Sequence, residues 1–161
     1  MTVYFTWLAG SGASAWVRAE SPWLWPLCET LHFTGLAMLV GIAGFIDIRL
    51  MGFLRSVPLH AVKGFRNWAM GAFLLNLTTG LIFFTGSVNQ YVVNPYWWAK
   101  VAFLVVAIAN ALAFELVIGR KPAAQDGDTP LSFKVVGALS LLAWLGVIVC
   151  GRLLPFVGGT D

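Results

Sequence analysis

Charged residues are scarce in this sequence. Asp, Glu, Lys and Arg account for 11% of its 161 residues, whereas a soluble domain normally carries roughly twice that share. Hydrophobic residues account for 59%, and the mean hydropathy is +0.82. So little charge cannot cover a soluble surface, and the composition therefore predicts an integral membrane protein.

Long polar connections are missing as well, which excludes a soluble domain between the apolar runs. Each run exceeds the roughly 20 residues that a helix needs to cross a hydrocarbon core about 30 Å thick. The predicted spans are Trp25–Leu54, Pro58–Val88, Pro95–Ile118 and Leu131–Phe156. The fold class that follows is all-α, an integral membrane four-helix up-down bundle over residues 25–157, preceded by a segment at 1–24 and followed by a tail at 158–161.

The first 24 residues lack the basic stretch and unbroken apolar run of a secretory signal peptide. They instead interleave Trp7, Trp16 and Trp23 with Gly, Ser and Arg18. This mixture is typical of an interfacial segment that lies on the membrane surface.

Lys and Arg are distributed unevenly among the connections. The first and third connections are flanked by Arg49, Arg55, Lys63, Arg66, Arg120, Lys121 and Lys134. Only Arg18, Lys100 and Arg152 remain for the other side. The positive-inside rule then predicts a multi-pass protein of the bacterial inner (plasma) membrane with both termini periplasmic. The net charge of +3 is explained by this topology, so no nucleic-acid partner is predicted.

The sequence also lacks a nucleophile paired with a base, and it has no Gly-rich phosphate loop. We therefore expect no enzymatic turnover by this chain alone. Function is sought instead among the ionisable residues within the spans, because such residues are costly in lipid and usually face the bundle interior.

Polar and soft side chains from all four spans fall at one depth near the predicted outer face. They are Cys28, Glu29, His32, Asn76, Thr78, Thr79, Lys100, Cys150 and Arg152. Glycines recur in the spans and allow close approach of helices or of a flat cofactor. A second, inner layer comprises Asp47, Arg49, His60, Lys63, Arg66, Glu115 and Arg120. Snorkelling and ion pairs, such as Asp47 or Glu115 with an Arg, account for the inner layer.

His32 is the sharpest candidate because a neutral imidazole ligates haem iron, copper or zinc. The leading hypothesis is a membrane electron-transfer protein that binds haem b, or a quinone, in the periplasmic half of the bundle. His32 would be the iron ligand or the quinone's hydrogen-bond partner, and Glu29 would orient it. Lys100 and Arg152 would bind anionic groups, and Thr79 completes the cofactor-binding set. The simpler interpretation is a hydrogen bond of His32 that only ties the bundle together.

A single haem clamped between both histidines is excluded by distance. About 20 residues, or roughly 30 Å of helix, separate His32 from the inner end of its span, where His60 begins the next one. The iron's other axial position would hold water, a weak non-His ligand, or the His32 of a second protomer.

Cysteine is rare, with two residues in the chain. In an oxidising compartment, Cys28 and Cys150 would form a disulfide between the first and fourth spans. With His32 they would instead form a soft metal site, which makes copper binding or transport the alternative function, although no Cys-x-x-Cys spacing is present. A third hypothesis is a non-catalytic accessory subunit. The predicted partners are therefore the lipid bilayer and a larger membrane complex or further copies of the chain.

Several stretches carry a resemblance to a known group of proteins: "ETLHFTGLAMLVGIAGFIDIRLMG", "TTGLIFF", "NPYWWAK", "AIAN" and "SLLAWLGVIVCGR". From about Trp25 to Arg152 the chain resembles an uncharacterised family of small four-helix bacterial inner-membrane proteins. The resemblance implies the fold and the location but no activity, and it singles out Glu29, His32, Asp47, Arg49, Lys100, Asn110 and Arg152. More loosely the chain is similar to membrane b-type cytochromes and copper-resistance membrane proteins, but it lacks the four His of the di-haem pattern.

Overall fold

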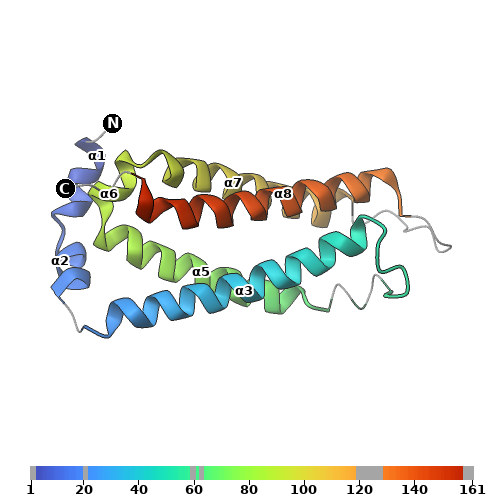
Figure 1. Ribbon diagram of the computed structural model, residues 1–161, viewed down its shortest axis with the longest axis horizontal. Helices are drawn as coiled ribbons and strands as arrows, with labels where there is room; N and C mark the ends of the chain where they lie inside the picture. The colour runs from blue at the N-terminus through green and yellow to red at the C-terminus, as the bar shows by residue number, and fades with distance from the viewer. Residues whose placement is uncertain (1–2, 20–21, 59–60, 62–63, 119–128, 158–161) are drawn as a thin grey trace.

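The computed structural model describes residues 3–19, 22–58, 61, 64–118 and 129–157. All secondary structure in these residues is helical. Four long helices run alternately up and down (Figure 1): α3 (Leu24–Leu50), α5 (Arg66–Gly86), α7 (Pro95–Ala113) and α8 (Leu131–Leu153). A π-helical turn extends α7 over Phe114–Ile118, and a 3-10 turn follows α8 over Leu154–Phe156. Each of the four segments is long and apolar enough to cross a membrane, so the predicted all-α, multi-pass architecture is confirmed.

Three short helices lie at one end of the bundle (Figure 1). They are α1 (Val3–Ala9), α2 (Gly12–Ala19) and α6 (Val88–Val93), and α1 packs on α6 while α2 packs on α5. We call this the termini end, and we call the end with the α3–α5 and α7–α8 connections the opposite end. That residues 1–24 lie in a membrane interface, and that the termini face the periplasm, stay predictions.

The first connection is longer than the sequence predicts. Helix α3 ends at Leu50, not Leu54, because Gly52 takes a left-handed backbone with φ of +95°, which glycine adopts without strain. Arg49 Nε then donates to the Val57 carbonyl at 2.6 Å and holds the connection against the end of α3. The second span consequently begins at Arg66, so the predicted start at Pro58 is wrong.

The start of α7 is fastened to the end of α8. Asn94 caps α7 by accepting a hydrogen bond from the Tyr96 amide at 2.9 Å, and Pro95 occupies the first turn, where a missing N–H costs nothing. The Asn94 amide also donates to the carbonyl groups of Leu154, at 3.0 Å, and Val157. Asn94 is fully buried, so this one side chain joins the two helices at the termini end.

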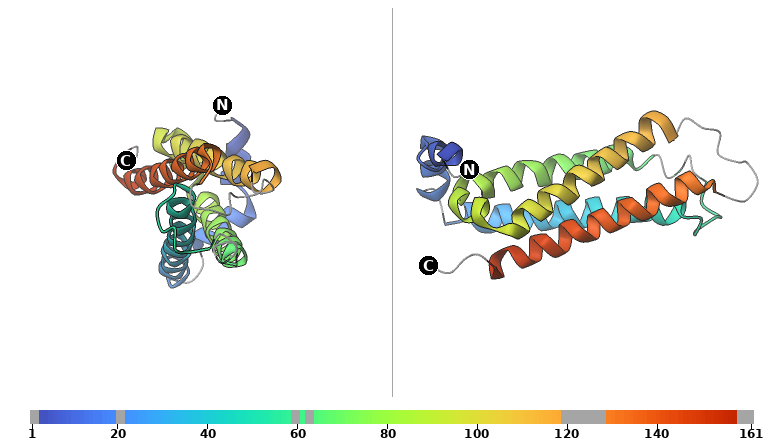
Figure 2. Two further views of the ribbon diagram at one scale, coloured as in Figure 1. Left: turned by 90° about the vertical axis from the view of Figure 1, so that its right-hand side faces the viewer. Right: turned by 90° about the horizontal axis from the view of Figure 1, so that it is seen from above.

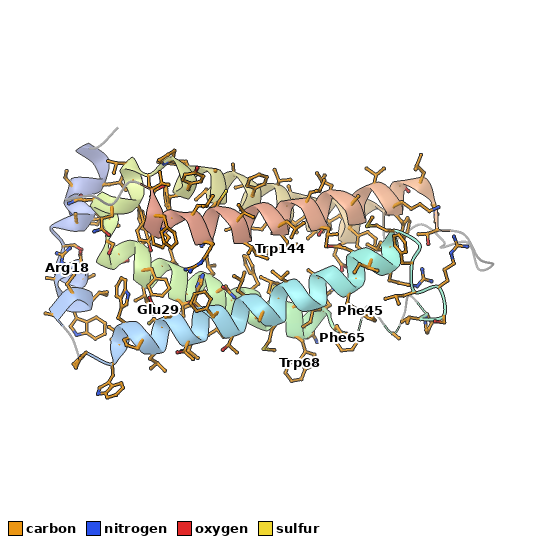
Figure 3. All side chains as sticks on the ribbon, in the orientation of Figure 1. Arg18, Glu29, Phe45, Phe65, Trp68 and Trp144 are labelled. Atoms are coloured by element: carbon orange, nitrogen blue, oxygen red, sulfur yellow. The ribbon has the colours of Figure 1, made fainter. Side chains whose placement is uncertain are left out.

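The four long helices form two hairpins that meet along α3 and α8. Helix α5 packs on α3 and α7 packs on α8, and the α7–α8 pair lies to one side of the α3–α5 pair (Figure 2). The buried centre combines small and large residues: Leu39, Ala72, Ala107, Ala143, Trp144 and Val147. Trp144 lies between α8 and α3 in mid-bundle (Figure 3). The alanines let the backbones approach closely, as expected of helices packed in lipid.

Several glycines are explained by helix packing alone. A Cβ atom added at Gly137 would lie 2.6 Å from the Asp47 carbonyl oxygen, so α8 touches the backbone of α3 there. A Cβ at Gly146 would overlap the Phe103 ring of α7, at 2.6 Å. At Gly35 the obstacle is the Asn76 amide of α5, at 2.5 Å. Three of the interhelical contacts therefore depend on the absence of a side chain.

Candidate functional site

His32 and Thr79 are in direct contact near the termini end. The ring Nδ1 of His32, on α3, lies 2.8 Å from Thr79 Oγ1, on α5. Thr79 is buried and His32 is half-buried. The hydrogen bond therefore joins two membrane helices, and Thr79, rather than Glu29, orients the imidazole.

The partners of Thr79 determine which ring nitrogen of His32 carries the proton. The Thr79 hydroxyl is 2.8 Å from the Leu75 carbonyl and 3.2 Å from that of Asn76, and its single proton is directed to them. Thr79 Oγ1 must then accept from His32, so Nδ1 is the donor. The Asn76 carbonyl is a further backbone acceptor for this ring. The neutral ring consequently keeps its lone pair on Nε2.

The imidazole is held between an aromatic ring and a glycine. Phe83 of α5 meets His32 edge-on with ring centroids 5.5 Å apart, and Trp25 lies 5.1 Å from Phe83 in turn. Gly80 faces the ring, since a Cβ added there would lie 3.6 Å from His32 Cε1. Phe83 therefore helps to fix the orientation of the ring. Because residue 80 is a glycine, no side chain from that position contacts the imidazole.

Lys100 brings a positive charge from α7 into the same layer. It is half-buried, and it acts electrostatically on both His32 and Cys150. Its ammonium group lies beside Gly151 of α8, 3.6 Å from where a Cβ atom would stand. No carboxylate among the described residues pairs with it. This ammonium group is therefore available to an anionic ligand.

Glu29 lies one turn nearer the membrane surface and is exposed (Figure 3). Its electrostatic partner is Tyr91 of α6, at the termini end. Burial raises the pKa of the Tyr91 phenol above its usual value of 10.0, and the negative charge of Glu29 raises it further. The predicted role of Glu29 in orienting His32 has no counterpart in the geometry.

Arg152 is directed away from the His32 layer. It is exposed, and its guanidinium lies over the ring of Phe156, 5.2 Å from the centroid. This contact is local to the end of α8, and the predicted role of Lys100 and Arg152 as a pair of cations around one ligand stays a prediction.

The predicted copper ligands do not form a metal centre. Cys28 and Cys150 are both buried and free, so no disulfide joins the first and fourth spans. No group of three His, Cys, Asp or Glu side chains in the described part of the chain is placed to hold a metal ion. Cys28, His32 and Cys150 share a depth, as the sequence predicts, but not a coordination sphere.

The charged layer at the opposite end is only partly explained by ion pairs. Arg66 and Glu115 form one, at 3.3 Å, as predicted. Asp47 is buried and forms no ion pair with a described residue, and the polar group that acts on its carboxyl group is Ser140 of α8. His60 and Lys63 lie outside the described residues, as do Arg120 and Lys121.

Sequence reasoning missed Phe83, Tyr91 and Ser140. Each belongs to a common residue type, and nothing near it in the sequence marks it as functional. Each acts on a residue of another helix. Phe83 packs against His32, Tyr91 interacts electrostatically with Glu29, and Ser140 acts on Asp47. Helical periodicity in an almost uniformly apolar span does not show which face meets which neighbour, so no sequence signal could have identified them.

Comparison with known proteins adds a family but no activity. No curated protein and no solved structure matches the chain. The looser likeness to b-type cytochromes and copper-resistance proteins therefore has no support from relatives. A family model does match residues 22–157, which is most of the chain and includes all four long helices. The chain belongs to this family, which is described as a family of unknown function, DUF6644.

Proposed function

We propose that the chain is a redox protein of the bacterial inner membrane that binds haem b at the termini end, with His32 Nε2 as the iron ligand. The supporting observation is the Nδ1–H bond from His32 to Thr79. Metal-ligating histidines commonly donate their other ring N–H to a fixed acceptor, which sets the tautomer and the ring orientation. A histidine that served packing alone would not need its second nitrogen left open.

The chemistry of the surrounding residues fits this cofactor. Lys100 supplies an unpaired cation in the His32 layer, where it would bind a haem propionate. Gly80 and Gly151 leave room beside the imidazole and the ammonium group. When bound, the haem supplies one-electron chemistry, while the protein contributes ligation, charge neutralisation and exclusion of water. The His32 of a second protomer would be a further residue that could hold the haem.

A quinol is the second candidate, because the same tautomer makes Nε2 a hydrogen-bond acceptor. It would accept from a quinol hydroxyl, but it would not donate to an oxidised quinone carbonyl, for which Lys100 is the available donor. Asn76 offers a further acceptor in this layer, since its Oδ1 atom is buried without a partner. This arrangement favours the reduced form of the ligand.

The test is an absorption spectrum of the detergent-purified protein, oxidised and then dithionite-reduced, with metal analysis of the same sample. We expect a Soret band that shifts on reduction and iron near one equivalent per chain or per dimer. His32→Ala should abolish both signals. The matched control is His60→Ala, which removes the chain's other histidine and should retain them.

Other results would overturn the haem proposal. A colourless sample that contains quinol, lost in His32→Ala, would establish the second candidate. Copper that depends on Cys150 would contradict the geometry of the thiols. A colourless, metal-free protein that co-purifies with a larger complex would identify an accessory subunit.

A further inference from the structure

Asp47 is a buried carboxyl group that the proposed function does not use. It lies on α3, three residues before the helix ends at Leu50, and only 4% of its surface is exposed. One of its carboxyl oxygens, Oδ2, is buried and makes no hydrogen bond. An acidic side chain this close to a helix end would normally snorkel to water, so its burial calls for an explanation.

The packing of α8 prevents Asp47 from reaching water. At Gly137 the backbone of α8 lies directly against the backbone of α3 at Asp47. A Cβ atom added to Gly137 would lie 2.6 Å from the backbone carbonyl oxygen of Asp47. Ser140, one turn further along α8, is buried, and its hydroxyl is the polar group that acts on the carboxyl group. Leu50 of α3 is 2% exposed and packs against the same glycine, with its Cβ 3.2 Å from where a Cβ of Gly137 would stand. The carboxyl group is thus enclosed in the α3–α8 contact.

No described cation neutralises this carboxyl group. On its own helix, Arg49 donates to the Val57 carbonyl at 2.6 Å and to Thr129 Oγ1 at 3.5 Å. Arg66, from α5, pairs with Glu115, which follows α7. Lys134, on α8, lies beside Gly52. As far as the described residues show, an ionised Asp47 would be buried without a counter-charge, which is strongly unfavourable.

The neutral acid avoids most of this cost. With a proton on the oxygen that faces Ser140, the carboxyl O–H donates to the Ser140 hydroxyl and no charge is buried. Oδ2 is then an uncharged carbonyl oxygen without a partner, which is much less unfavourable than a buried charge. Among the described residues, Asp47 belongs to no group of three acidic, Cys or His side chains that could hold a metal ion.

We propose that Asp47 is a proton-binding site in the α3–α8 contact at the opposite end of the bundle. Its carboxyl group holds a proton while the two helices are closed together there. It loses that proton to water, leaving the carboxylate, only when the contact opens. Proton release and the separation of α3 from α8 at this end are therefore one linked event. The site lies at the other end of the bundle from His32 and does not depend on a cofactor.

Infrared spectroscopy of the purified full-length protein tests this directly. A protonated carboxyl group has its own C=O stretching band, distinct from the carboxylate bands, and it shifts in D₂O. The chain has only seven Asp and Glu, and Glu29 and Glu115 are exposed, so few groups compete. We expect one such band at neutral pH that disappears in Asp47→Asn and persists in the control Glu115→Gln.

A second variant keeps the test valid if Asp47→Asn does not fold. Ser140→Ala removes the hydrogen-bond partner, and we expect the band to move to the higher frequency of a free acid carbonyl. Thermal denaturation provides an independent measurement. The wild-type midpoint should fall as the pH rises from acid values through neutral, because the unfolded Asp47 ionises first, and Asp47→Asn should remove most of that slope. The absence of a protonated-acid band at neutral pH, a band unaffected by both variants, or stability that depends on Na⁺ instead of pH would each overturn the proposal.

Discussion

The two ends of the bundle enclose polar groups in opposite ways. At the termini end, His32 is half-buried and its ring is hydrogen-bonded to Thr79, while the nearby Lys100 ammonium group forms no ion pair within the described part of the chain. At the opposite end, Asp47 is sealed by direct backbone contact with α8. Both layers lie within apolar spans where polar groups are costly. Position along the helices therefore does not decide whether a polar group is accessible. His32 and Lys100 are half-buried, whereas Asp47 is 4% exposed, and we call their surroundings the open layer and the closed layer respectively.

The largest effect is expected from a methyl group placed in the closed layer. Gly137→Ala would put a Cβ 2.6 Å from the Asp47 carbonyl oxygen, and neither backbone can yield without separating α3 from α8. Overpacking of this kind costs about 1–3 kcal/mol, measured as a loss of thermal stability in detergent. Gly41→Ala is the control, since nothing lies within 4 Å of an added Cβ there. Equal stability of the two variants would show that the contact is not closed.

The next effect concerns the open layer. Thr79→Val keeps the shape of the side chain but removes the acceptor for His32 Nδ1–H, so the ring loses its fixed orientation. Loss of such a supporting hydrogen bond weakens metal binding by about 10- to 100-fold, and haem content should fall accordingly in a titration with added haemin. The neighbouring Thr78 is exposed and donates to the Leu74 carbonyl at 2.9 Å, so Thr78→Val is a matched control that should bind haem normally.

A smaller effect is expected at the surface near the closed layer. Arg66 and Glu115 form an ion pair at 3.3 Å with both side chains substantially exposed. Exposed pairs contribute about 0–1 kcal/mol, so Glu115→Gln should change the denaturation midpoint little and lose what effect it has in high salt. If Glu115→Gln destabilised the protein as much as Gly137→Ala does, the ion pair would have to support the same contact between helices that encloses Asp47.

The smallest effect concerns Tyr91, beside the open layer. Because burial and Glu29 raise its pKa, the unfolded chain releases the phenol proton at a lower pH than the folded protein does. Its contribution to stability is therefore intact below the unfolded pKa and falls as the pH rises through the folded one. In an alkaline absorbance titration, Tyr91→Phe should remove a tyrosine transition that lies above the usual range, and Glu29→Gln should shift that transition to lower pH.

How far the sequence predicts the site can be judged residue by residue. The sequence placed His32, Thr79 and Lys100 at one depth, because a fixed rise per residue converts sequence position into position along a helix. It could not show that Thr79, rather than Glu29, would bond His32, because that depends on how α3 and α5 are rotated about their axes. Arg152 was predicted in the same set and instead contacts its own turn at Phe156.

The sequence by itself determined the membrane character, the helical class and three of the four span starts to within one residue, since apolar length and composition act locally. The start of α5 could not be predicted from the sequence, because Arg49 and Gly52 shape the preceding connection through contacts that form only on folding. Only the tertiary structure decided which polar groups are open and which are sealed. In lipid, one apolar helix face is as favourable as another, so hydrophobicity does not select which faces pack together. Close approach at glycines such as Gly137 makes that selection. It also determines which polar side chains lose access to water.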